Sequence, residues 1–150
     1  DVVVSICARI CSIRARMADY VTLFVALHTG DGRFEGAGSC PPLFVRRANG
    51  TQEIIDVRGP WCGVAADISK VVTKQTFELQ PQDSLVLLTD GFLEAQNPAG
   101  ELFGEDRVTQ QFAELAPKGP QAVIDGLFSV TDAFAPEQND DMTAFCLRRQ

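Results

Sequence analysis

The chain has 150 residues, which is long enough for one domain with a substantial hydrophobic core. Hydrophobic residues make up 45% of it and charged residues 22%, which is typical of a globular rather than a disordered chain. The formal net charge of -7 argues against nucleic-acid binding, because no stripe of Lys and Arg is available to neutralise phosphates.

The first half of the sequence predicts one helix followed by strands. Residues 3–17 have helical periodicity, and residues 20–28 are rich in the β-branched and aromatic side chains of strands. The segment TGDGRF predicts a turn into a partner strand over residues 33–37. PPLFVRR and TQEIIDV flank Asn49-Gly50, a dipeptide typical of hairpins, and VVTKQTFELQ predicts a further strand.

The second half predicts one buried strand, two helices and a closing strand. After a turn at residues 81–83, SLVLLT is apolar at both alternating positions, which is typical of a central strand covered on both faces. Two helical stripes follow, one from Glu105 to a stop at Pro117 and one between Pro120 and Pro136. MTAFCLRR closes the chain as a strand. Helices grouped beside antiparallel strands predict an α+β fold in a single domain.

The five cysteines are scattered and include no Cys-x-x-Cys pair. Their odd number and their spacing suit neither a zinc site nor a disulfide framework. We therefore expect buried free thiols in a reducing cytosol, and a cytoplasmic protein. No apolar run reaches the ~18 residues of a membrane span, and no signal peptide is visible.

Two groups of acids fall at predicted strand ends. Asp90 follows the buried strand, and the adjacent Gly91 allows either a close backbone approach or a positive φ. Asp140 and Asp141 precede the closing strand. If that strand pairs with residues 84–89, the carboxylates share one sheet edge, where their oxygens suit a hard cation such as Mg²⁺ or Mn²⁺. Both segments are also common turn sequences, and spacing alone favours that interpretation.

Four other features have structural interpretations that outweigh catalytic ones. His28, at a strand end, is expected to be a surface residue rather than a base. Ser39 lacks the Gly-x-Ser-x-Gly elbow of a hydrolase nucleophile. Trp61 is expected to cap the core rather than line a substrate surface. Arg46 and Arg47 are expected to be solvated strand-edge charges rather than a site for a phosphorylated partner.

TDGFLEAQNPAGELFGEDRV, followed at a distance by NDDMTAFCLRR, resembles the SpoIIE/RsbU-like branch of the PPM metal-dependent serine/threonine protein phosphatases. YVTLFVAL and GAGSCPPLFVR resemble earlier motifs of that branch in the same order. The resemblance implies an α/β/β/α sandwich of antiparallel sheets flanked by helices, with two Mn²⁺ or Mg²⁺ ions at the sheet edge. It implies that Asp90 and Asp140 are catalytic metal ligands and that Asp141 is a further ligand or orients the loop. Gly91 would shape the turn after Asp90, and Glu94 would lie beside the metal ligands without binding the metal itself.

The resemblance also implies a function. A metal-activated water would hydrolyse phosphoserine or phosphothreonine on an anti-sigma-factor antagonist in bacterial partner switching, with a sensory or receiver domain possible upstream. Two earlier acidic motifs of the branch are missing, and Ser39 and Cys40 replace a His and an Asn. Two interpretations stay open: a phosphatase domain that lacks its first strands, or a non-catalytic pseudophosphatase that binds the same partner.

Overall fold

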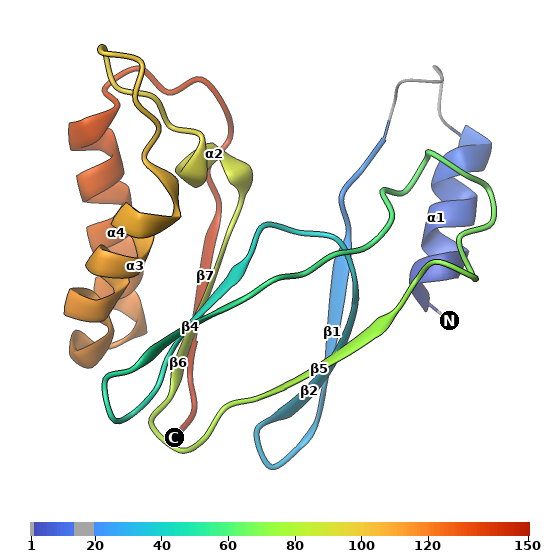
Figure 1. Ribbon diagram of the computed structural model, residues 1–150, viewed down its shortest axis with the longest axis horizontal. Helices are drawn as coiled ribbons and strands as arrows, with labels where there is room; N and C mark the ends of the chain where they lie inside the picture. The colour runs from blue at the N-terminus through green and yellow to red at the C-terminus, as the bar shows by residue number, and fades with distance from the viewer. Residues whose placement is uncertain (1, 14–19) are drawn as a thin grey trace. The chain divides into compact units, whose positions relative to one another are not determined.

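The strands form two antiparallel sheets, one in each of two units into which the chain divides. The computed structural model describes residues 2–13 and 20–150. The first unit comprises residues 1–40 and 57–78, and the second comprises residues 41–56 and 79–150 (Figure 1). Antiparallel sheets accompanied by helices confirm the predicted α+β class.

The described part of the first unit contains one helix and three strands. They are α1 (Val2–Ile13), β1 (Phe24–Gly30), β2 (Arg33–Gly38) and β5 (Lys74–Glu78), with the strands in the order β1-β2-β5. Residues 14–17 of the predicted helix lie outside the described residues. The strand predicted from residue 20 begins only at Phe24, and Val21 forms an isolated bridge with Cys62 instead. The predicted turn is present, because Gly30, Asp31 and Gly32 all have positive φ, at 110°, 50° and 74°.

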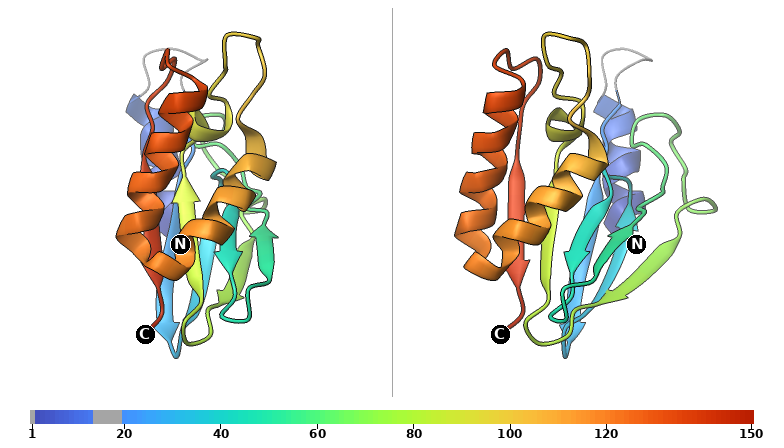
Figure 2. Two further views of the ribbon diagram at one scale, coloured as in Figure 1. Left: turned by 90° about the vertical axis from the view of Figure 1, so that its left-hand side faces the viewer. Right: turned by 60° about the vertical axis from the view of Figure 1, so that its left-hand side comes forward.

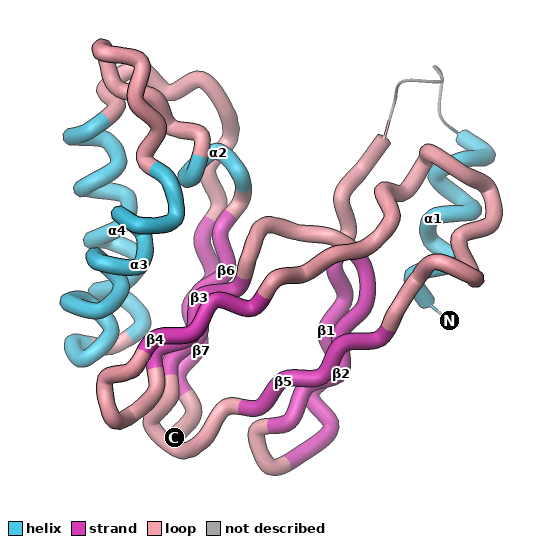
Figure 3. The backbone as a smooth tube through the Cα atoms, in the orientation of Figure 1, coloured by secondary structure: helices cyan, strands magenta, loops and turns pink. Residues whose placement is uncertain are grey.

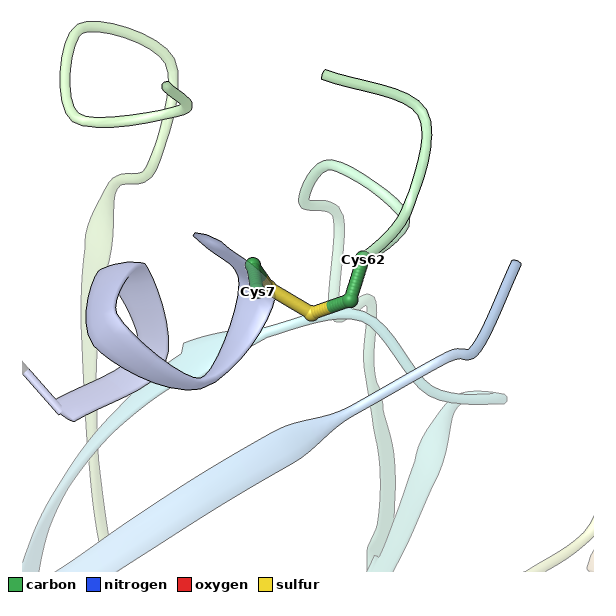
Figure 4. Close-up of a disulfide and its surroundings, with 2 residues drawn as sticks. All are labelled: Cys7 and Cys62. Carbon is green, nitrogen blue, oxygen red and sulfur yellow. A yellow bond between two sulfur atoms is a disulfide. The ribbon is translucent and has the colours of Figure 1, made fainter. Parts of the chain in front are cut away.

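The structure corrects the expectation that all cysteines are free. Cys7 of α1 and Cys62 form a disulfide across 55 residues of sequence, with their Cα atoms 4.4 Å apart (Figure 4). Both are fully buried and share a small core with Val3 and Ile68. Spacing could not reveal this pair, because it is folding that brings the Cys62 loop to the helix. Cys11, Cys40 and Cys146 are free.

The second unit contains a sheet of four strands in the order β4-β3-β6-β7. Its strands are β3 (Leu43–Arg46), β4 (Gln52–Ile55), β6 (Ser84–Leu88) and β7 (Ala144–Arg148). The predicted Asn49-Gly50 hairpin joins β3 to β4, with Gly50 at a φ of 93°. β6 has a strand on each side and four of its five residues are buried, as its apolar sequence predicted.

Three helices belong to this second unit. α3 (Gly104–Leu115) and α4 (Pro120–Phe134) contact each other and the sheet, and the short 3-10 turn η1 (Ala116–Lys118) joins them (Figure 2). Both long helices were predicted. The four-residue helix α2 (Asp90–Leu93), which begins where β6 ends, was not (Figure 3). The buried side chains of α2, α3 and α4 form one core with those of β3 and β6. This core includes Phe44, Val86, Phe92, Phe112 and Leu127.

Arg47 is not the solvated edge charge that the sequence suggested. Its Nη1 donates a hydrogen bond of 2.8 Å to Oδ2 of Asp83, which is only 1% exposed, and its Nη2 pairs with Glu53. The backbone N–H groups of Ala48 and Gln80 also donate to Asp83. Asp83 therefore connects the β3–β4 hairpin to the turn before β6.

None of the helices in the described part of the chain has the length and apolarity that crossing a bilayer requires.

Candidate functional site

One edge of the second unit's sheet brings the two acidic segments together. β6 and β7 pair antiparallel, and Leu88 at the end of β6 lies opposite Ala144 at the start of β7. The segment after β6, which begins with Thr89 and Asp90, therefore lies beside the segment that precedes β7. This pairing is the condition on which the sequence prediction of a shared edge depended.

Thr89 holds the two segments in place. Its backbone N–H donates to the carbonyl of Thr143 at 3.0 Å. Its hydroxyl donates to the carbonyl of Asp141 at 3.1 Å and accepts from the N–H of Thr143 at 2.9 Å. Three hydrogen bonds from one residue thus fix the loop before β7 against the end of β6.

Gly91 shows which of its two expected roles applies. Its φ lies outside the left-handed region, so conformational freedom is not the reason for the glycine. A Cβ at this position would lie 2.5 Å from the carbonyl oxygen of Asp141 and 3.2 Å from Cγ of Met142. The loop can approach the end of β6 only because residue 91 has no side chain.

The structure places the predicted acids as follows. Asp90 is exposed at the first position of α2, and its Oδ1 accepts a hydrogen bond of 3.2 Å from the N–H of Gly91. Asp140 and Asp141 are exposed in the loop before β7, and Oδ1 of Asp140 accepts a bond of 2.7 Å from the N–H of Asp141. Glu94 caps α2, its N–H donating to the carbonyl of Asp90.

The sequence predicts that these carboxylates contribute to a metal-binding ligand set. Oxygen ligands of this type suit Mg²⁺ and Mn²⁺. Within residues 2–13 and 20–150, no group of three or more His, Cys, Asp or Glu side chains is close enough together to hold a metal ion. Mg²⁺ commonly keeps several waters and uses one or two carboxylates, so two aspartates at one edge fit its requirements.

A cavity of about 170 Å³ lies in the same unit beside this edge. Gly91 and Asp140 line it, together with Glu94 and Ala95 just after α2, Thr131 near the C-terminal end of α4, and residues of the segment between α4 and β7. Thr131 and Glu137 are among the lining residues that sequence reasoning missed as site candidates. Thr131 falls within the helical stripe predicted between Pro120 and Pro136, where one polar residue among apolar ones is the only signal that the sequence offers.

Cys40, Cys146 and His28 show no sign of nucleophilic chemistry. Burial raises the pKa of the Cys40 and Cys146 thiols to about 11, which keeps them protonated at neutral pH. His28 is exposed, and its Nε2 accepts a bond of 3.3 Å from the N–H of Gly32, so it stabilises a turn.

Trp61 does not cap the core as expected. It is 48% exposed and stacks on Tyr20 with the ring centroids 4.6 Å apart.

Comparison with protein families matches residues 5–150 to the family described as Stage II sporulation protein E (SpoIIE). A comparison with curated protein sequences found no match.

Several solved structures share the fold. The SiaA-PP2C domain of Pseudomonas aeruginosa is 17% identical, with a TM-score of 0.80 over 96% of this chain and 58% of its own. The phosphatase domain of SpoIIE from Bacillus subtilis, presoaked with Mn, is also 17% identical, with a TM-score of 0.66 over 99% of this chain and 65% of its own. The RsbU and RsbW domains of a Mycobacterium tuberculosis protein are 23% identical, with a TM-score of 0.59 over 85% of this chain and 36% of that one. The chain thus spans less than two thirds of each of these three solved chains.

Proposed function

The chain belongs to the SpoIIE family, and from this we propose that it forms part of a metal-dependent phosphatase domain that hydrolyses phosphoserine or phosphothreonine in a protein. The observation that supports the proposal best is the antiparallel pairing of β6 with β7. That pairing gathers Asp90, Asp140 and Asp141 at one sheet edge, in segments that Thr89 joins by three hydrogen bonds.

Each of these residues has a role in the proposal. Asp90 and Asp140 would hold Mn²⁺ or Mg²⁺ through their carboxylate oxygens, with water or further protein oxygens completing the ligand set. When bound, the ions supply an activated water and neutralise the charge on the phosphoryl oxygens. Asp141 would position the loop, since its carbonyl is fixed by Thr89. Gly91 would keep the two aspartate segments close, and Glu94 would support the helix that begins at Asp90.

The substrate that we propose is a phosphorylated anti-sigma-factor antagonist. The resemblance to the RsbU-like branch supports it, as does the likeness in fold to a solved chain that carries an RsbU and an RsbW domain. A partner-switching role of this kind would place the protein in the cytoplasm. A sensory or receiver domain attached to the phosphatase would also fit such a role.

Turnover of a generic phosphomonoester by the full-length protein tests the activity. We expect hydrolysis that requires Mn²⁺ and stops on addition of a chelator. Asp90→Asn and Asp140→Asn should each reduce turnover by roughly 100-fold or more and weaken Mn²⁺ binding measured by calorimetry.

Asp132→Asn is the matched control, because it removes the same charge from an exposed position on α4 that does not line the cavity. It should keep wild-type turnover and wild-type Mn²⁺ affinity. Wild-type behaviour of Asp90→Asn and Asp140→Asn would remove these residues from the site. Absence of turnover in the wild-type protein, with the partner still bound, would instead identify a pseudophosphatase.

A further inference from the structure

Two arginines flank the start of β6 on one face of the second unit's sheet. Arg46 of β3 and Arg148 of β7 each lie directly opposite Ser84 of β6. Residues that pair directly across strands point to the same face, so these three side chains form one row. Phe44 and Val86, two residues away along their strands, share this face and belong to the core that the helices complete. The arginines therefore occupy the last row of the face that carries the helices.

Neither guanidinium has an acidic partner. Arg46 and Arg148 are partly buried, and the Nε atom of each is buried without a hydrogen-bond partner. Within the described residues neither forms an ion pair, and their one side-chain hydrogen bond runs from Nη2 of Arg148 to Oε1 of Gln82, at 2.8 Å. Arginine stays charged in proteins, and a partly buried charge without a counter-charge is unfavourable. The row therefore carries two positive charges that the described structure does not neutralise.

The adjacent Arg47 shows the contrast. Its guanidinium pairs with Asp83 and with Glu53, so its charge is balanced within the fold. The chain as a whole has a formal net charge of -7, so an unbalanced pair of cations is a local exception to its acidic character. A ligand drawn to this row should therefore carry negative charge.

The placement of the guanidiniums favours a ligand with two separated negative groups. Their Nε atoms are out of reach, whereas Nη1 of each has no partner and remains accessible. Neighbouring strands are ~4.8 Å apart, so the Cα atoms of Arg46 and Arg148 lie roughly 10 Å from each other. Nη2 of Arg46 lies 3.8 Å from where a Cβ at Gly50 would be, in the β3–β4 turn, and Arg148 is bonded to Gln82 in the turn before β6. Because different turns hold the two guanidiniums, two carboxylates on one chain match them better than one small anion.

We propose that Arg46 and Arg148, on either side of Ser84, bind an acidic segment of a partner protein, with one carboxylate at each guanidinium. In an extended segment, residues three positions apart are about 10 Å apart, which matches the spacing of the arginines. Ser84 begins β6, whereas Asp90 follows its other end, so this surface is separate from the proposed metal-binding edge. It would recruit a partner whether or not the edge is catalytic.

Two matched peptides test the surface by fluorescence anisotropy with the full-length protein. The probe is a labelled Ser/Gly peptide with two glutamates three positions apart, and its match has glutamine at both positions. We expect saturable binding of the glutamate peptide that weakens as the ionic strength rises, and no saturable binding of the glutamine peptide. Arg46→Gln and Arg148→Gln should each weaken binding about tenfold, because a hydrogen bond to a charged group has roughly that effect.

Three controls separate recognition from charge and from folding. Arg33→Gln removes the same charge from an exposed strand position of the first unit and should keep wild-type affinity. Arg46→Lys keeps the charge but loses the planar fork, so its affinity should fall between those of wild type and Arg46→Gln. The midpoint of urea unfolding should not fall in Arg46→Gln, because the variant removes a charge that has no counter-charge. A lower midpoint would show that the arginine stabilises the sheet instead.

The outcomes also separate this surface from the phosphatase proposal. Turnover of a generic phosphomonoester should be the same in the arginine variants as in wild type, because neither residue lies at the metal-binding edge. Equal binding of both peptides, or wild-type affinity in Arg46→Gln and Arg148→Gln, would overturn the surface and leave the phosphatase proposal standing. Displacement of the peptide by an equal concentration of inorganic phosphate would also overturn it, because it would identify a site for one small anion. Absence of turnover would count against the phosphatase alone.

Discussion

Thr89 connects the two aspartate segments through one hydroxyl group. The hydroxyl donates to the carbonyl of Asp141 and accepts from the N–H of Thr143. A serine could make both bonds, whereas valine could make neither. The position of Asp140 relative to Asp90 therefore depends on a side chain that is not itself expected to bind metal.

Thr89→Val should destabilise the protein by about 1–2 kcal/mol, since two exposed hydrogen bonds are lost. Urea unfolding measures this change, and hydrogen exchange should show faster exchange of the Thr143 N–H, which loses its acceptor. Thr89→Ser is the matched control and should retain slow exchange. Slow exchange of the Thr143 N–H in the valine variant would contradict the role given to the hydroxyl.

At the level of elements, Asp83 joins the β3–β4 hairpin to the turn before β6. Burial alone would raise the pKa of its carboxyl. The hydrogen bond from Arg47 and those from the N–H groups of Gln80 and Ala48 outweigh burial and hold the pKa below its ordinary value of 3.8. The charged carboxylate therefore stabilises the folded state, and it does so only while it remains ionised.

Asp83→Asn should reduce the free energy of unfolding at pH 7 by about 1–3 kcal/mol, because a buried charge pair is broken while Arg47 remains partly exposed. Because the folded pKa is lowered, the difference from wild type should be constant above about pH 5 and shrink as the pH falls through the folded pKa. Urea unfolding between pH 3 and 7 measures it. Glu53→Gln removes the exposed partner of Arg47 and should cost at most about 1 kcal/mol. A pH-independent difference would argue against the ionised pair.

Elements with a strong local pattern were predicted well. The apolar stripe of α3 stops before Pro117, that of α4 lies between Pro120 and Pro136, and the β3–β4 hairpin has Asn-Gly at its turn. α2 was missed because four residues are too few to show a helical period. Residues 20–23 have the composition of a strand, yet only Val21 is bridged, and it pairs with Cys62. Composition indicates that a segment suits a strand and leaves open whether a partner lies beside it.

At the scale of the whole molecule, the two units differ in how they are stabilised. The second unit has a core built from its helices and from β3 and β6, with residues of β7 packed against it. The first unit has a small core of buried residues, Val3, Cys7, Cys62 and Ile68, in which the disulfide closes a loop of 55 residues. A covalent link of that span compensates for limited apolar burial by reducing the entropy of the unfolded chain.

Cys7→Ser, or reduction of the wild-type protein, should lower the stability of the first unit by about 2–4 kcal/mol. Thermal unfolding with and without reductant measures the loss, and amide exchange should accelerate in α1 and around Cys62. Cys11→Ser removes a free thiol of the same helix and should change little. Identical melting curves of the wild-type protein with and without reductant would show that the disulfide is not present in solution.

The sequence by itself determined the α+β class, the order of most elements and the resemblance to a phosphatase family. These features depend on periodicity, turn residues and motifs that lie close together in the chain. Only the tertiary structure decided which cysteines pair, that Arg47 is held by Asp83, that Gly91 is needed for close approach rather than for its φ, and that Thr131 lines a cavity. Each of these depends on contacts between residues far apart in sequence, or on the space around one residue, and neither leaves a local pattern to detect.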